Sequence, residues 1–98
     1  MTYKIVFRPE AELELAGAYG WYEERRRGLG EDQLDSVESV VESICEKRES
    51  YPVVHLGIRR AFLQRFPYGI FYLVEDEHVV VLAVFHASRD PRHWQIRK

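Results

Sequence analysis

The sequence has little of what marks several large classes of protein. Its 98 residues include one cysteine, one methionine, four prolines and six glycines. Because Cys45 is alone, the chain can form neither an internal disulfide nor a cysteine-based zinc site. The longest apolar run, residues 79–85, is far shorter than the roughly 18 residues that a membrane span requires. We therefore expect a protein that does not enter the membrane.

Repeats, low-complexity tracts and linkers are also missing. Domains of about 100–150 residues are the most common, so we expect residues 1–98 to form a single domain. No apolar signal segment precedes the first predicted strand, and we expect a cytoplasmic protein. The histidines lack ligand spacing with cysteines or carboxylates, so we expect no metal and no cofactor; they are His55, His78, His86 and His93.

The net charge of −2 hides an uneven distribution of charge along the chain. Residues 1–49 hold twelve acidic and seven basic side chains, whereas residues 50–98 hold seven basic and four acidic ones. An acidic or phosphate-rich partner would therefore meet the second half of the chain. The total charge is too low to predict direct binding to nucleic acid.

The first half of the chain predicts one strand and two helices. Residues 3–8 are rich in β-formers, and Pro9 suits the first turn of a helix that ends at the glycines near residue 28. A second helix is predicted from about Glu31, with apolar residues spaced by three and four. The short connection between the two helices indicates an antiparallel helical hairpin.

The second half predicts a loop at residues 53–57 and three strands, at residues 59–66, 70–75 and 78–86. The connections are too short for parallel returns, so these strands should be antiparallel neighbours. The predicted fold class is α+β, in the order β-α-α-β-β-β. The helical hairpin packs on one face of a mostly antiparallel sheet of about four strands, and the first strand lies at an edge or beside the last one.

Both faces of the last two strands are apolar, because residues of both parities in 70–74 and 79–85 are apolar. A helical hairpin covers one face only, so we expect another protein to cover the second face. The alternatives are that the tail, with Trp94 and Ile96, folds back over this face, or that two copies pair there as a homodimer.

Two segments are the most distinctive: Arg-Phe-Pro-Tyr-Gly-Ile-Phe-Tyr at residues 65–72, and His-Ala-Ser-Arg-Asp-Pro-Arg-His-Trp at residues 86–94. With the opening Tyr-Lys-Ile-Val-Phe-Arg-Pro-Glu-Ala and Trp21-Tyr22-Glu23, they resemble the plasmid-stabilisation toxins of the RelE/ParE superfamily. The resemblance covers nearly the whole chain, and its element order agrees with the order predicted above.

This resemblance implies a toxin of a type II toxin–antitoxin system, neutralised by a cognate antitoxin that often carries a DNA-binding end. The other end of the antitoxin would wrap the toxin, which agrees with the second apolar sheet face. The strand residues expected to bind the antitoxin are Phe71, Tyr72, Val80, Leu82 and Val84. ParE-like members inhibit DNA gyrase without bond-breaking chemistry, whereas RelE-like members cut mRNA on the ribosome.

The two activities require different residues. RNA cleavage needs a general base, a general acid and cations near the phosphate. His86, Arg65 and Arg89 are the catalytic candidates for an endoribonuclease, but a C-terminal phenol or second acid is not evident. Trp94 occupies the nearest aromatic position, and an indole cannot act as a general acid. We therefore favour a ParE-like gyrase inhibitor that is not an enzyme.

For a gyrase inhibitor, the expected target-binding residues are the strand arginines and the C-terminal segment, residues 89–98. They are Arg60, Arg65, Arg89, Arg92 and Trp94. Each has a structural alternative: Arg65 could pair with a helix glutamate, and Asp90 could cap a final turn of helix at Pro91. A non-toxic homologue that only binds its cognate antitoxin is a further alternative.

Overall fold

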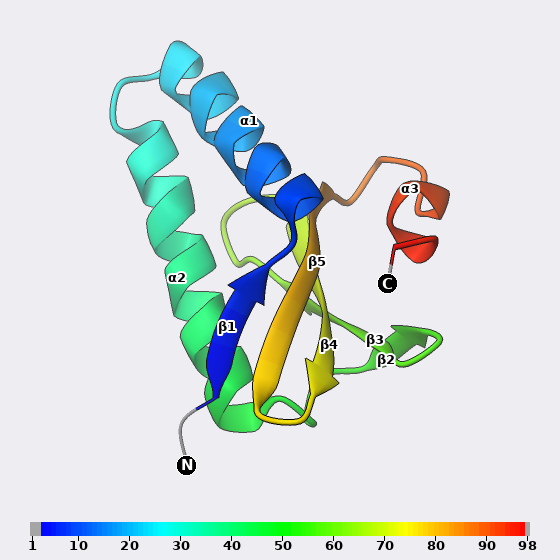
Figure 1. The fold of residues 1–98 in the computed structure, drawn as a ribbon. Helices are drawn as coiled ribbons and strands as arrows, with labels where there is room; N and C mark the ends of the chain where they lie inside the picture. Colours follow the sequence, from blue (N-terminus) through cyan, green and yellow to red (C-terminus); the bar gives the residue numbers. More distant parts are fainter. Residues whose placement is uncertain (1–2, 98) are drawn as a thin grey trace.

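The computed structural model describes residues 3–97, which form a five-stranded sheet, two long helices and one short helix (Figure 1). In chain order the elements are β1 (Lys4–Phe7), α1 (Pro9–Arg25), α2 (Leu29–Lys47), β2 (Val53–His55), β3 (Ile58–Phe62), β4 (Tyr68–Glu75), β5 (His78–His86) and α3 (Arg92–Gln95). Within these residues, no helix combines the length and the apolar character that crossing a membrane requires.

The turn between the two long helices is built by one glutamate. The carboxylate of Glu23, near the end of α1, accepts hydrogen bonds from the backbone N–H groups of Gly28 and Gly30, at 2.9 and 2.8 Å. Gly28 has a positive φ of 88°, and a Cβ on Gly30 would lie only 2.8 Å from the carbonyl oxygen of Tyr19. Because Glu23 accepts hydrogen bonds from backbone N–H groups that have no partner within α2, that helix can begin at Leu29, slightly earlier than predicted.

The sheet confirms the predicted fold class. Its strand order is β1-β5-β4-β3-β2, with β1 parallel to β5 at one edge and the other neighbours antiparallel. The β4–β5 pairing runs from Tyr68 opposite His86 to Glu75 opposite His78, and its register shifts between Phe71 and Tyr72. The first strand therefore lies both at an edge and beside the last strand, as expected.

Two details of the predicted strands were wrong. Residues 53–57, predicted as a loop, contain strand β2, which pairs with β3 through a turn at Leu56 and Gly57, both with positive φ. The β-prone Val53 and Val54 form a strand because β3 offers a free edge. The strand predicted at 59–66 ends at Phe62, since the chain then folds back and the N–H of Leu63 donates to the carbonyl of Tyr68.

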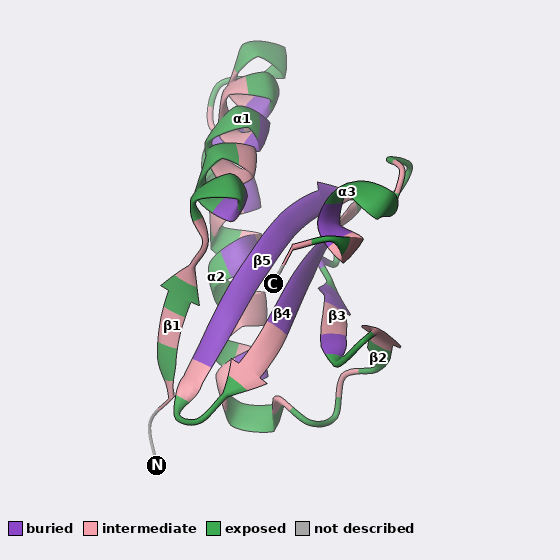
Figure 2. Cartoon of the chain, turned by 45° about the vertical axis from the view of Figure 1, so that its right-hand side comes forward, coloured by how far each residue is buried: buried purple, intermediate pink, exposed green. Residues whose placement is uncertain are grey.

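The sheet separates two apolar cores. On the helical side, Tyr72, Val81 and Val84 pack with Val37 and Ile44 of α2. On the other side lies a smaller cluster, formed by Ile58, Phe71, Val80, Leu82, Ala83, Phe85 and Trp94. Figure 2 shows that β5 is buried along nearly its whole length.

The second face is therefore not left open, contrary to our expectation. The indole of Trp94, on α3, stacks on the ring of Phe71 with centroids 4.1 Å apart and only 4% of the residue exposed. Val54 of β2 packs against the same cluster. A single turn of helix suffices because one indole covers a large area, so the tail alternative holds for Trp94. Ile96 does not cover this face, because it is 86% exposed.

Candidate functional site

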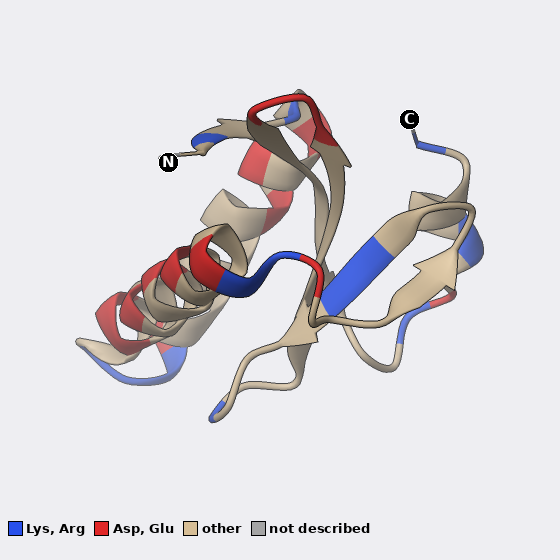
Figure 3. Cartoon of the chain, turned by 90° about the horizontal axis from the view of Figure 1, so that it is seen from below, with Lys and Arg blue, Asp and Glu red and all other residues tan. Residues whose placement is uncertain are grey.

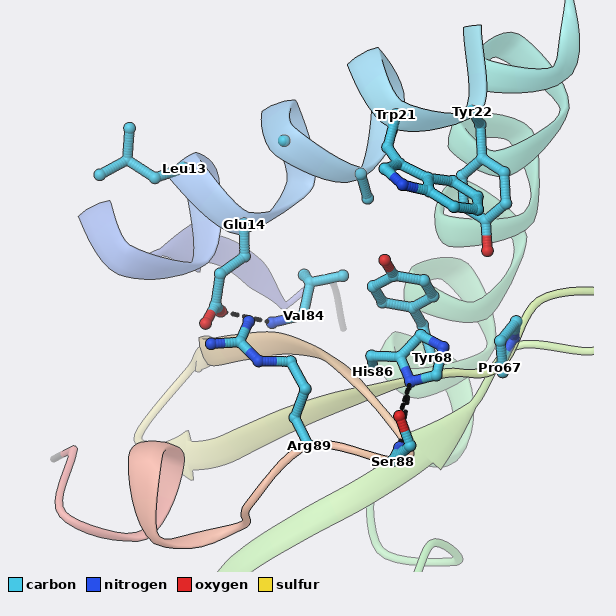
Figure 4. Close-up of a pocket in the computed structure, with 12 residues that line it drawn as sticks. Leu13, Glu14, Trp21, Tyr22, Pro67, Tyr68, Val84, His86, Ser88 and Arg89 are labelled. Atoms are coloured by element: carbon cyan, nitrogen blue, oxygen red, sulfur yellow. Dashed lines mark hydrogen bonds between the residues drawn. The ribbon is translucent and has the colours of Figure 1, made fainter. Parts of the chain in front are cut away.

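A cavity of about 730 Å³ lies between α1 and the end of β5 (Figure 4). Leu13, Gly17 and Trp21 of α1 form one wall, and Tyr68, His86 and Arg89 lie across from them. The remaining lining residues are Glu14, Ala18, Tyr22, Pro67, Val84 and Ser88. Leu13 and Trp21 are 74% and 50% exposed, so the cavity has an apolar rim that is open to solvent.

His86 is held in one orientation at the floor of this cavity. Its Nδ1 accepts a hydrogen bond of 3.0 Å from the backbone N–H of Ser88 and lies 2.8 Å from the hydroxyl oxygen of the same residue. An accepting ring nitrogen carries no proton, so the neutral imidazole has its proton on Nε2. The ring of Tyr68 lies edge-on to the imidazole, with centroids 5.2 Å apart.

The electrostatics of the cavity centre on Tyr68 and Arg89. Burial raises the pKa of the Tyr68 phenol, and the nearby Arg89 guanidinium opposes part of this shift. The phenol is therefore neutral near pH 7 and can donate a hydrogen bond, but it cannot serve as a base. Arg89 is exposed, and its guanidinium lies 4.5 Å from the centre of the Phe85 ring.

Glu14 is the only carboxylate among the lining residues, and its oxygens are occupied. Oε1 accepts from the backbone N–H of Val84 and from Arg97, while Oε2 accepts from the second terminal nitrogen of Arg97. These bonds occupy both carboxylate oxygens and leave neither free to act as a general base. The sequence analysis did not single out Glu14, although its position between Ala11 and Ala18 on the buried face of α1 was a signal.

The catalytic candidates divide into two groups. His86 and Arg89 line the cavity, whereas Arg65 does not. Arg65 lies 3.7 Å from the carboxylate of Asp32, which is also 3.8 Å from Arg26. Arg65 therefore forms an ion pair with a helix carboxylate, as its structural alternative proposed, but the partner is an aspartate of α2 and not a glutamate.

Of the expected target-binding residues, Arg89 and Arg92 are exposed, and Arg92 pairs with Asp90 at 2.6 Å. The guanidinium of Arg60 lies 4.3 Å from the ring centre of Phe62, beside the second core. Trp94 is buried, because stacking on Phe71 removes its ring from solvent; its expected contact with a target stays a prediction, and it requires the ring to leave this position. Lys98 lies outside the described residues.

The residues expected to bind the antitoxin are all buried. Tyr72 and Val84 belong to the helical-side core; Phe71, Val80 and Leu82 belong to the second core. The expectation that they offer an open surface was wrong, because α1, α2 and α3 cover both faces of the sheet. Exposed apolar residues are found instead on α1, at Leu13 and Trp21, and on strands β1, β2 and β3, at Val6, Val53 and Phe62; sequence reasoning had selected none of them as site residues.

Charge is segregated on the molecular surface. Figure 3 shows acidic residues along the two long helices, with basic residues on β3, in the helical turn and near the C-terminal end. Among residues 3–97, no three histidine, cysteine, aspartate or glutamate side chains come together in a group that could hold a metal ion.

The fold is shared with chains of two solved toxin–antitoxin systems. A chain of the chromosomal ParDE system from P. aeruginosa is 18% identical, with a TM-score of 0.66, over 89% of this chain and 98% of that one. A chain of the toxin–antitoxin complex RelBE2 from Mycobacterium tuberculosis is also 18% identical, with a TM-score of 0.59, over 88% and 99%. At this identity, the likeness establishes the fold of small toxin–antitoxin proteins.

The model of the ParE toxin family, described as the ParE toxin of the type II toxin–antitoxin system parDE, matches residues 5–91. The chain belongs to this family. No curated protein matches the sequence. The matched range includes both long helices, strands β2 to β5 and all of β1 except Lys4, and it ends just before α3.

Proposed function

We propose that this protein inhibits DNA gyrase in the cytoplasm and is neutralised by a cognate antitoxin with a DNA-binding N-terminal part. The observation that carries this proposal is the match to the ParE toxin family over residues 5–91, a range that includes every residue lining the cavity. In this account the system stabilises a plasmid or a chromosomal locus, because cells that lose the antitoxin are poisoned.

The mechanism is steric and electrostatic. The rim of the cavity offers Trp21 and Leu13 as apolar contacts and Arg89 as an exposed cation. Large aromatic and arginine side chains contribute strongly at protein interfaces, since they bury much area and carry directed charge. This surface would engage gyrase without breaking a bond, and the antitoxin would neutralise the toxin by occluding it.

The test is expression without antitoxin, combined with a supercoiling assay on the purified protein. We expect growth inhibition, DNA-damage signalling and inhibited supercoiling. Arg89→Ala should weaken inhibition about tenfold, the loss expected when a contact worth about 1.4 kcal/mol is removed. Arg27→Ala removes an exposed arginine from the helical turn and is the matched control. Unimpaired supercoiling at saturating toxin, or normal growth on strong expression, would overturn the proposal.

A ribosome-dependent endoribonuclease is the second candidate, favoured by one observation. His86, Tyr68 and Arg89 line the same cavity and could supply a base, an acid and a cation to a bound phosphate. Mapping mRNA ends after induction separates the candidates. Codon-phased cuts that vanish with His86→Ala would establish the nuclease, whereas intact mRNA with inhibited supercoiling would exclude it.

A further inference from the structure

The side chain of Arg97 ties the C-terminal tail, residues 89–97, to α1 and β5. The guanidinium of Arg97 lies 3.0 and 2.9 Å from the two carboxylate oxygens of Glu14 on α1. It also donates to the carbonyl oxygen of Leu82 on β5, at 3.2 Å. The side chains of this ion pair are only 17% and 14% exposed, for Arg97 and Glu14 respectively.

The backbone groups that this pair contacts belong to a free strand edge. β1 pairs with β5 only as far as Phe7 opposite Val81, after which the chain turns into α1 at Pro9. Beyond Val81, β5 has no neighbouring strand on that side. Glu14 accepts from the N–H of Val84, and Arg97 donates to the carbonyl of Leu82, so the two side chains replace a missing strand.

The tail covers the second apolar face at the same time. Trp94 stacks on Phe71, and the imidazole of His55 lies edge-on to the indole, with centroids 6.1 Å apart. The helix that carries Trp94 has four residues, too few to be stable alone. Beyond it, Ile96 is almost fully exposed, so the hold of the tail depends on Trp94 and Arg97.

We propose that the tail is a releasable strap, and that its release opens a docking surface for another protein. That surface consists of the apolar face under Trp94 and the adjoining backbone carbonyl of Leu82 on β5. The occupant that fits it carries an aromatic side chain and, three residues later, a basic one, because Trp94 and Arg97 fill the site with this spacing. The inference holds whichever molecule the toxin inhibits.

The strap is suited to local opening. A segment with few buried contacts opens at a lower free energy than the rest of a domain. Opening would expose Phe71 and Leu82 and would free the carbonyl oxygen of Leu82, which together give a partner apolar area and a backbone hydrogen-bond acceptor. A partner segment with the same spacing could then place its aromatic residue on Phe71 and its basic residue at the carbonyl of Leu82.

The first test measures how well the tail protects Trp94. In full-length protein with Trp21→Phe, Trp94 is the remaining tryptophan, and acrylamide quenching reports its exposure. Arg97→Ala should raise the open population about tenfold, since charged hydrogen bonds contribute about 1.5–3 kcal/mol, and quenching should rise with it. Arg92→Ala is the matched control, because the side chain of Arg92 pairs only with neighbouring Asp90 in the described structure and is 83% exposed.

Two results of this test would overturn the proposal. Equal quenching in both variants would show that Arg97 does not hold the tail. Loss of the helical circular dichroism signal in Arg97→Ala alone would show that the pair belongs to the global core. Glu14→Gln provides a second variant, since it keeps an acceptor for the N–H of Val84 but loses the charge that holds Arg97.

The second test concerns the occupant. A fluorescently labelled peptide with the sequence of residues 89–97 is added to full-length wild type and to Arg97→Ala, and binding is followed by anisotropy. The peptide should bind the Arg97→Ala protein about tenfold more tightly than wild type, because the tail of the variant protein competes less for the site. A peptide with alanine at the tryptophan position should not bind. Equal affinity of the two peptides would contradict the proposed docking surface.

Discussion

The two faces of the sheet are equally apolar but very unequally covered. On one face, two helices of 17 and 19 residues bury Tyr72 and Ile44 completely. On the other, one four-residue helix and a three-residue strand bury Phe71 and Leu82 almost as well. The comparison shows that the burial of a residue does not reveal how firmly the segments that cover it, here the two long helices or the tail, are attached to the sheet. We expect the helical cover to open only on global unfolding and the tail cover to open locally.

The largest expected effect comes from the helical side. Ile44→Ala removes a fully buried side chain of α2 from the larger core and should lower the free energy of unfolding by about 2–5 kcal/mol. Urea denaturation followed by circular dichroism measures the loss. A loss below 1 kcal/mol would mean that α2 is held no more firmly than the tail, and the comparison would fail.

The next effect is the response of the helical side to alkaline pH. Burial raises the pKa of the Tyr72 phenol to about 12, well above its ordinary value of 10. The stabilisation from the neutral phenol is therefore complete below pH 10 and is lost as pH rises from 10 to 12, by up to about 2–3 kcal/mol.

The matched variant for this measurement is Tyr72→Phe, which keeps the ring but loses the hydrogen bond that the hydroxyl donates to the carbonyl of Arg48. Its stability should be lower at pH 8 and should fall less steeply between pH 10 and 12. Part of the slope should persist, because burial also raises the pKa values of Tyr22 and Tyr68. An unchanged slope would show that the phenol of Tyr72 is accessible to water.

On the face covered by the tail, Trp94→Ala should lower the free energy of unfolding by less than the size of the side chain suggests. Full burial of an indole predicts a loss of about 3–5 kcal/mol for Trp94→Ala. Because the strap can detach instead of enclosing a cavity, we expect about 1–2 kcal/mol, together with increased binding of an apolar dye. A loss of about 3–5 kcal/mol in the free energy of unfolding, without increased dye binding, would show that the tail is held as firmly as the two long helices.

The smallest effect sharpens the comparison within the helical side. Gln33 of α2 is fully buried, and its amide nitrogen and oxygen have no hydrogen-bond partner among the described residues. Replacing an unsatisfied amide by an apolar chain of similar length is favourable, so Gln33→Met should raise the free energy of unfolding by about 1 kcal/mol. A decrease, measured under the same urea conditions, would indicate that the amide has a partner such as bound water.

Much of this fold could be predicted because its signals are local. The continuous apolar run of residues 79–85 predicted the position of β5, and the short connections determined the antiparallel order. The cover of the second face could not be predicted from such patterns. The Glu14–Arg97 contact joins positions 83 residues apart, and α3 is too short to show helical periodicity.

The candidate site was predicted less completely than the fold. His86 and Arg89 were selected from a segment that does line the cavity. Arg65 and Trp94 were selected from equally distinctive segments, but one pairs with Asp32 and the other is buried. A sequence pattern identifies residues that can carry charge or bind a partner, whereas their exposure depends on tertiary contacts that no local pattern encodes.

Native-state hydrogen exchange tests the unequal attachment of the two covers most directly. The amides to compare are those of Trp94 and Arg97 in the tail, which donate to the carbonyls of Pro91 and Trp94, and that of Val41 in the middle of α2. We predict that the tail amides exchange through a local opening that low concentrations of denaturant do not affect, while Val41 exchanges only on global unfolding. Exchange of all these amides with the same free energy and denaturant dependence would contradict the account.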